Sequence, residues 1–166
     1  MLSVISFNPR PRAFWTRSML GLGFAATLTF CPSARAAASG DSVVDPSALA
    51  SLEQRANEAA PREKPYLYTE LADRLTVLAA TQLRSGEPEQ AVATLEKVEA
   101  CTQQIDSEVN VKSKDLKKAE MRLRETQRRL HDLARSVSGD IKVRLQQTLK
   151  RINATQSSLL AVLFSH

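Results

Sequence analysis

The sequence predicts an all-α fold, a small antiparallel helical bundle, from two observations. Apolar residues recur at spacings of three and four from Leu49 onward, which is the period of an amphipathic helix. Glycine is nearly absent from the same region, where only Gly86 and Gly139 follow Gly40. A sheet needs turn residues far more often than this, and no alternation with a period of two is visible. Helices are therefore the one consistent prediction.

Residues 1–38 have the features of a removable secretory leader. The first 18 residues carry three arginines and no acidic residue, and residues 19–30 then form an uncharged run. That run is too short to cross a bilayer, which takes about 20 apolar residues, but it suits the core of a signal peptide. Small residues follow it and match the A-x-A pattern, so the sequence predicts cleavage after Ala36 or Ala38.

Three other interpretations of the leader fit less well. The apolar run is short for an uncleaved anchor. A lipoprotein needs a small residue before its modified cysteine, but the bulky Phe30 precedes Cys31. Pro11 separates two arginines that export of folded proteins would require to be adjacent. We therefore expect general secretion, which places the protein in the periplasm or outside the cell.

Removal of the leader changes what the composition means. The whole chain has a formal net charge of +5, whereas residues 39–166 hold 19 basic and 18 acidic residues. The basic character of the whole chain thus belongs largely to the leader and does not argue for nucleic-acid binding. Cys101 is then left alone, so an intrachain disulfide is excluded. It is interpreted as a small, partly buried apolar residue, with an intermolecular bridge or a redox thiol as the alternative.

The predicted elements begin with a linker and a short first helix in residues 39–64, followed by a bundle domain over residues 65–164. Asp45-Pro46 is a helix-start signal, and Pro61 ends the run. The apolar positions between them have helical spacing: Leu49, Leu52, Ala56 and Ala59.

The second and third helices form a predicted hairpin. Pro65 opens the second helix and Gly86 ends it, after which Glu87-Pro88 starts the third. The apolar stripe of the second helix is Tyr68, Leu71, Leu75, Leu78 and Ala79, with Leu67 beside it. The buried face of the third is Ala91, Leu95, Val98, Thr102 and Ile105.

This hairpin carries a family resemblance. Leu78-Ala79, Gly86, Ala91, Leu95 and Val98 have the spacing with which small residues let two antiparallel helices pack around a glycine turn. Residues 78–98 resemble the turn and second helix of a tetratricopeptide repeat. The resemblance implies the packing of a helical hairpin and no binding residues. Arg74 stands where the family most often has an aromatic residue, and no second copy follows at the repeat period of about 34 residues.

A heptad seam follows, and it predicts a second, coiled-coil-like hairpin with antiparallel arms. The seam is Leu116, Ala119, Leu123, Thr126, Leu130, Leu133 and Val137. Ser138-Gly139-Asp140 is the predicted turn, and the last helix buries Ile141, Leu145, Thr148, Ile152, Leu159 and Leu163. The chain thus has three long helices and a short leading one. Whether one helix runs from Pro88 to Val137 or breaks near Asn110 is left open.

Charge is distributed unevenly along the chain. Residues 41–110 hold 13 acidic and 6 basic residues, whereas residues 111–166 hold 5 acidic and 13 basic. In one interpretation the two halves of the bundle attract each other. In the other, a basic surface binds a polyanion or a protein partner. Residues 111–163 have no aromatic side chain to stack a base, which argues against nucleic acid. The candidate surface residues are Lys117, Lys118, Arg122, Arg124, Arg128 and Arg129.

Nothing in the sequence indicates catalysis. His131 and His166 are too few for a metal cluster, and no nucleophile elbow, phosphate loop or dinucleotide motif occurs. We therefore expect no cofactor, metal or small-molecule substrate.

The predicted function is that of an exported, non-catalytic interaction or structural protein of the cell envelope, with a protein partner or self-association through the seam. The alternative is binding to anionic lipid through the basic helix 112–137. The apolar end 159–164 is interpreted as core rather than as a membrane anchor.

Overall fold

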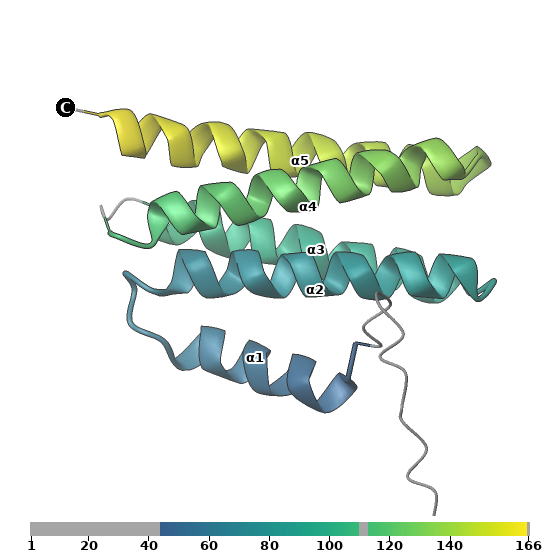
Figure 1. Ribbon diagram of the computed structural model, residues 1–166, viewed down its shortest axis with the longest axis horizontal. Coiled ribbons are helices and arrows are strands. Elements are labelled where there is room, and N and C mark those ends of the chain that lie inside the picture. The colour runs from purple at the N-terminus through teal and green to yellow at the C-terminus, as the bar shows by residue number, and fades with distance from the viewer. Residues whose placement is uncertain (1–43, 110–112, 166) are drawn as a thin grey trace, which may run out of the picture. The chain divides into compact units, whose positions relative to one another are not determined.

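The computed structural model describes residues 44–109 and 113–165, and all of them belong to one unit that runs from Gly40 to His166. The predicted leader, residues 1–38, lies outside the described residues. Within them the elements are all helices, which confirms the all-α class (Figure 1). They are α1 (Pro46–Glu58), α2 (Lys64–Arg84), α3 (Pro88–Glu108), α4 (Leu116–Ser136) and α5 (Gly139–Phe164).

The first helix begins where its cap signal predicts. The Asp45 carboxylate accepts hydrogen bonds from the backbone N–H of Ser47 at 2.9 Å and from its hydroxyl at 2.8 Å, and Pro46 occupies the first turn. These bonds satisfy a donor that a helix start otherwise leaves without a partner. The helix ends at Glu58, before Pro61.

Both hairpin turns contain a glycine in the left-handed region. Gly86 lies between α2 and α3 with φ +77°, and Gly139 begins α5 with φ +64°. A side chain in this conformation places its Cβ too close to the following carbonyl oxygen. The two glycines that follow Gly40 in the sequence therefore occupy the two tight turns, one in each hairpin.

The open question about the long middle segment is settled as a break. α3 ends at Glu108 and α4 begins at Leu116, so the bundle has four long helices and a short one rather than three and one. Asn110, where the break was considered, lies outside the described residues. The chain reverses here because the seam of α4 packs against α2 and α5, and an unbroken rod would carry that seam away from them.

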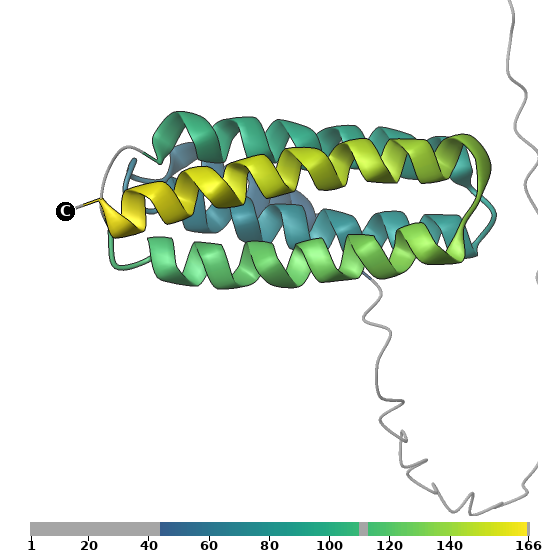
Figure 2. The same cartoon turned by 90° about the horizontal axis from the view of Figure 1, so that it is seen from above.

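The four long helices form a bundle in which each has two neighbours. α2 packs against α3 and α4, and α5 packs against α3 and α4, whereas α1 lies against α2 alone. The arms of each hairpin are antiparallel, as predicted for the second. The hairpins then stack so that parallel helices lie side by side, α2 with α4 and α3 with α5 (Figures 1 and 2).

The predicted apolar stripes form the core of this bundle. Most of their members are buried, and Leu78, Leu133, Val137, Ile141 and Leu163 are half-buried at its edges. The apolar end of α5 is divided, because Leu159 is buried but Phe164 is 73% exposed. The seam of α4 is covered within one chain by α2 and α5.

Candidate functional site

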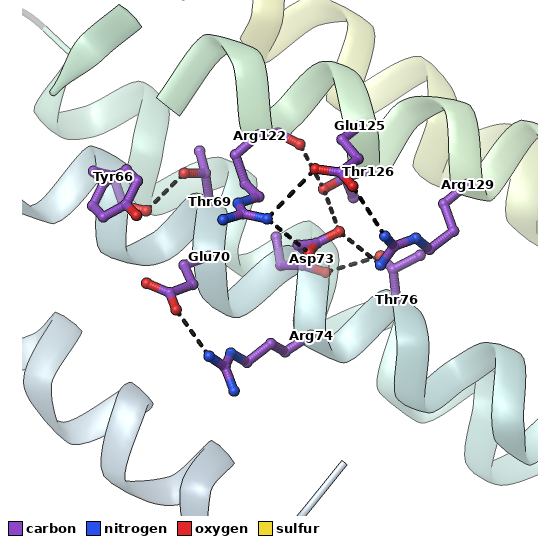
Figure 3. A network of polar contacts seen from close by, with 11 residues as sticks. Tyr66, Thr69, Glu70, Asp73, Arg74, Thr76, Arg122, Glu125, Thr126 and Arg129 are labelled. Carbon is purple, nitrogen blue, oxygen red and sulfur yellow. Dashed lines mark hydrogen bonds and ion pairs between the residues drawn. The ribbon is translucent and has the colours of Figure 1, made fainter. Parts of the chain in front are cut away.

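The six predicted surface residues divide into an inward pair and an outward group. Arg122 and Arg129 lie two turns apart on α4, and both reach Asp73 on α2 (Figure 3). Arg129 Nη1 lies 3.0 Å from Asp73 Oδ1, and Arg122 Nη1 lies 3.7 Å from Oδ2. These two arginines therefore join the hairpins.

Asp73 is the centre of a closed network. The Thr126 hydroxyl donates to Asp73 Oδ1 at 3.3 Å, and Glu125 pairs with Arg122 at 3.4 Å and with Arg129 at 3.3 Å. Asp73 itself is 7% exposed. Burial raises the pKa of its carboxyl above 3.8, because desolvation outweighs the opposing effect of Arg129 and Arg122. Two cations and two carboxylates balance one another here, so the network is structural.

A second set of polar contacts joins α3 to α5. The Thr148 hydroxyl donates to Glu99 Oε1 at 2.8 Å, and the Thr155 hydroxyl donates to Asp106 Oδ2 at 2.9 Å. Donors and acceptors are both seven residues apart, which is the register of two parallel helices. Arg144 adds an ion pair to Glu99 at 3.4 Å. Each contact links an acid of the first half to a donor of the second, so part of the charge asymmetry serves the fold.

The outward group comprises Lys117, Lys118, Arg124 and Arg128, all exposed. Lys118 Nζ lies 2.9 Å from Asp115 and 5.9 Å from the centre of the Tyr66 ring, while Arg124 pairs with Glu120 at 2.6 Å. Within residues 44–109 and 113–165, Lys117 and Arg128 form no ion pair. These two cations remain available to a partner.

The exposed face of α4 forms a basic ridge, which we define as Lys117, Met121, Arg124, Arg128 and Arg135. Their spacings of four, three, four and seven place them on one face, opposite the buried seam. Met121 is 61% exposed in the middle of these cations. At 1.5 Å per residue the ridge is about 27 Å long. A shallow groove of about 270 Å³ runs beside it, lined by Arg124, Gln127, Arg128, His131, Leu149 and Asn153.

An apolar groove lies on the other side of the molecule, between α1, α2 and α3, with a volume of about 440 Å³. Leu71, Leu75 and Leu78 of α2 line it, with Leu49 on the α1 side and Ala100 on the α3 side. The sequence assigned the leucines to helix stripes but gave no sign of the groove. It depends on α1 resting on α2 alone, a tertiary arrangement that no local spacing encodes.

Cys101 borders this groove as a buried, free thiol. Burial, with a smaller effect from the negative charge of Glu53, raises its pKa to about 12. At neutral pH the sulfur stays protonated and is a poor nucleophile. The interpretation as a small buried residue is confirmed.

Within the described part of the chain, no three His, Cys, Asp or Glu side chains gather closely enough to hold a metal ion. Among the five helices, none has the length and apolar character needed to span a membrane. No protein-family model, no curated protein and no solved structure matches the chain. The tetratricopeptide resemblance of residues 78–98 therefore stays a prediction.

Proposed function

We propose that this chain is an exported, non-catalytic interaction protein of the cell envelope, and that the basic ridge of α4 contacts a protein partner. One observation carries the proposal. Of the six candidate residues on α4, Lys117 and Arg128 remain without an ion pair among the described residues, and they lie on either side of the exposed Met121.

The composition of the ridge suits a protein interface. Methionine and arginine are enriched in such interfaces, where a flexible apolar side chain fills a pocket and guanidinium groups bind carboxylates. The surrounding positive charge increases the rate of encounter with an acidic surface and selects against basic ones. The expected partner surface is thus acidic, with an apolar depression for Met121.

A crosslinking experiment in the native envelope tests this proposal. A photoreactive residue replaces Met121 on the ridge and, as a matched control, the exposed Val143 on α5. We expect a discrete adduct from position 121 alone, and its yield falls at high salt and with the double variant Lys117→Glu/Arg128→Glu. Identical adducts from both positions would contradict the proposal. So would an adduct whose yield the double variant leaves unchanged.

A second candidate is binding to anionic lipid, and the same unpaired cations favour it. Co-sedimentation with vesicles of phosphatidylcholine, with and without phosphatidylglycerol, separates it from the first. Lipid binding predicts salt-sensitive sedimentation with the anionic vesicles only, reduced by Lys117→Glu/Arg128→Glu. No sedimentation at low salt would remove this candidate.

Export is part of the proposal and has its own test. N-terminal sequencing of the protein recovered from cells is expected to begin after Ala36 or Ala38. Mature protein that still carries residue 1 or 2 would contradict the leader, whatever the ridge binds.

A further inference from the structure

The groove beside the basic ridge, between α4 and α5, is lined almost entirely by side chains that donate hydrogen bonds. Its volume is about 270 Å³. Its lining residues come from both helices: Arg124, Gln127, Arg128, His131, Leu149 and Asn153. Among the residues that the structure describes, no carboxylate lines this groove. Three other grooves on the bundle each include one, from Glu53, Asp73 or Glu99. The charge of the groove beside the ridge therefore selects an anion.

A buried carboxylate holds one of the two arginines in place. Arg124 Nη2 lies 2.6 Å and Arg124 Nε 3.2 Å from Glu120 Oε1, and Gln156 Nε2 donates to the same oxygen at 3.1 Å. Glu120 is only 6% exposed, so it anchors Arg124 at the groove. Arg128, one turn further along α4, forms no ion pair with any described residue. Two guanidinium groups against one carboxylate leave one positive charge in excess here.

Two carboxamides complete the groove. The side chains of Gln127 on α4 and Asn153 on α5 line it, and in the described part of the chain neither amide forms a hydrogen bond. A carboxamide both donates and accepts, so it can pair with the C=O and the N–H of a peptide. Leu149, which is half-buried, supplies an apolar surface. An acidic residue within a peptide has a part for each of these groups, whereas a phospholipid head group has the anion but no peptide group.

We propose that this groove binds an acidic side chain of the protein partner, with Arg124 and Arg128 on the carboxylate and the two carboxamides on the adjacent peptide groups. Guanidinium groups bind carboxylates through directed, charge-assisted hydrogen bonds. One carboxylate also matches the single excess positive charge. The inference rests on the proposed function, since the groove shares both arginines with the basic ridge, and it names the group that the partner presents.

Side-chain NMR signals of the isotope-labelled protein test the proposal. The probes are two capped pentapeptides that differ only in their central residue, which is glutamate in one and glutamine in the control. We expect the glutamate peptide to shift, in a saturable manner, the Nε–H signals of Arg124 and Arg128 and the side-chain amide signals of Gln127 and Asn153. Because two exposed cations are involved, it should bind roughly two- to twentyfold more tightly than the glutamine peptide.

Three variants separate the groove from the rest of the surface. Arg128→Leu should reduce the preference for glutamate by roughly one-and-a-half- to fivefold, because one cation is lost. Asn153→Asp places a carboxylate in the lining and should weaken binding of the glutamate peptide. Its matched control, Ala154→Asp, adds the same charge at an exposed position of α5 outside this lining and should leave binding nearly unchanged. Circular dichroism verifies that each variant is folded.

Equal affinity for the two peptides, or no saturable shift by either, would overturn the proposal, as would equal weakening by Asn153→Asp and Ala154→Asp. If dihexanoyl phosphatidylglycerol shifts the groove signals and the glutamate peptide does not, the groove is a lipid head-group site instead. Failure of the proposed function is distinguishable. Shifts confined to the backbone signals of Lys117 and Met121 would retain the ridge and remove the groove, whereas shifts of the groove signals without a crosslink from Met121 would do the reverse.

Discussion

The two hairpins are built alike but carry opposite charge. Each has two long antiparallel helices joined at a glycine with positive φ, yet acids predominate in the α2–α3 hairpin and bases in the α4–α5 hairpin. Where the hairpins meet, the basic hairpin donates hydrogen bonds to Glu99 and Asp106 and forms an ion pair with Asp73. A charge imbalance along a sequence therefore indicates a partner only after the pairs inside the fold are subtracted.

The same distinction appears between adjacent residues of α4. Arg129 pairs with Asp73, whereas Arg128 faces solvent on the ridge. One step along a helix turns a side chain by about 100°, so neighbours in sequence serve different surfaces. The four predictions below test what holds each hairpin together and what joins the two, from the largest effect to the smallest.

The largest effect is expected from the shared core. Leu123 of α4 has no exposed surface, so Leu123→Ala should reduce the free energy of unfolding by about 3 kcal/mol through lost burial and a residual cavity. Urea unfolding followed by circular dichroism measures it. Both tyrosines, Tyr66 and Tyr68, lie in α2, so in protein without residues 1–38, which include Trp15, their fluorescence reports separately on the acidic hairpin.

Coincidence of the two signals decides whether the hairpins form one cooperative unit. We expect Leu123→Ala to shift the circular dichroism and tyrosine transitions together. If the tyrosine transition keeps its wild-type midpoint while helicity is lost earlier, the hairpins unfold independently.

A smaller effect is expected from charge reversal at the hairpin interface. Arg129→Glu places a carboxylate beside Asp73 and should destabilise the fold by about 1–2 kcal/mol, while the matched Arg128→Glu should change stability by no more than about 0.5 kcal/mol. Both variants change the net charge equally. Thermal melts at low and high salt measure the difference, which salt should reduce. Equal destabilisation by both would mean that Asp73 does not hold the hairpins together.

Local signals in the sequence predicted the elements well. Asp45-Pro46, Gly86 and Gly139 mark boundaries because capping and left-handed turns depend on one or two residues. The seam of α4 is also buried as its spacing predicts, with Leu133 and Val137 at its edge. Each of these features is determined within a few residues.

Features that depend on which helices become neighbours were not predictable. Arg122 and Arg129 could not be separated from Arg128, because Asp73 is about 50 residues away in the sequence and only the stacking of α2 on α4 brings it near. The groove between α1 and α3 depends on the same kind of information.

The glycine turns predict an effect that is similar in both hairpins. A Cβ added at Gly86 or Gly139 would meet nothing within 4 Å, so the cost of alanine is conformational and not steric. We expect Gly86→Ala and Gly139→Ala each to lower the free energy of unfolding by about 1 kcal/mol, measured by urea denaturation. A much larger loss at one turn would show that its hairpin alone depends on a fixed turn geometry.

The smallest effect concerns the protonation of Asp73, and its sign is informative. An ion pair dominated by attraction would lower the pKa of the carboxyl, but here burial dominates and raises it above 3.8. The folded state therefore binds this proton more tightly than the unfolded state does. The stability that Asp73 contributes is then fully present below 3.8 and is lost as pH rises through the folded-state pKa.

Comparison with Asp73→Asn isolates this contribution, since asparagine keeps the shape of the side chain but does not titrate. The unfolding free energy of the wild type, minus that of the variant, should increase as pH falls from neutral toward 3.8. Urea titrations of both proteins across this range measure the difference, in which the titrations of other carboxyls largely cancel. A difference that decreases over the same range would show that the attraction of Arg122 and Arg129 outweighs burial. The charges of the basic hairpin, and not desolvation at the interface, would then determine the pKa of Asp73.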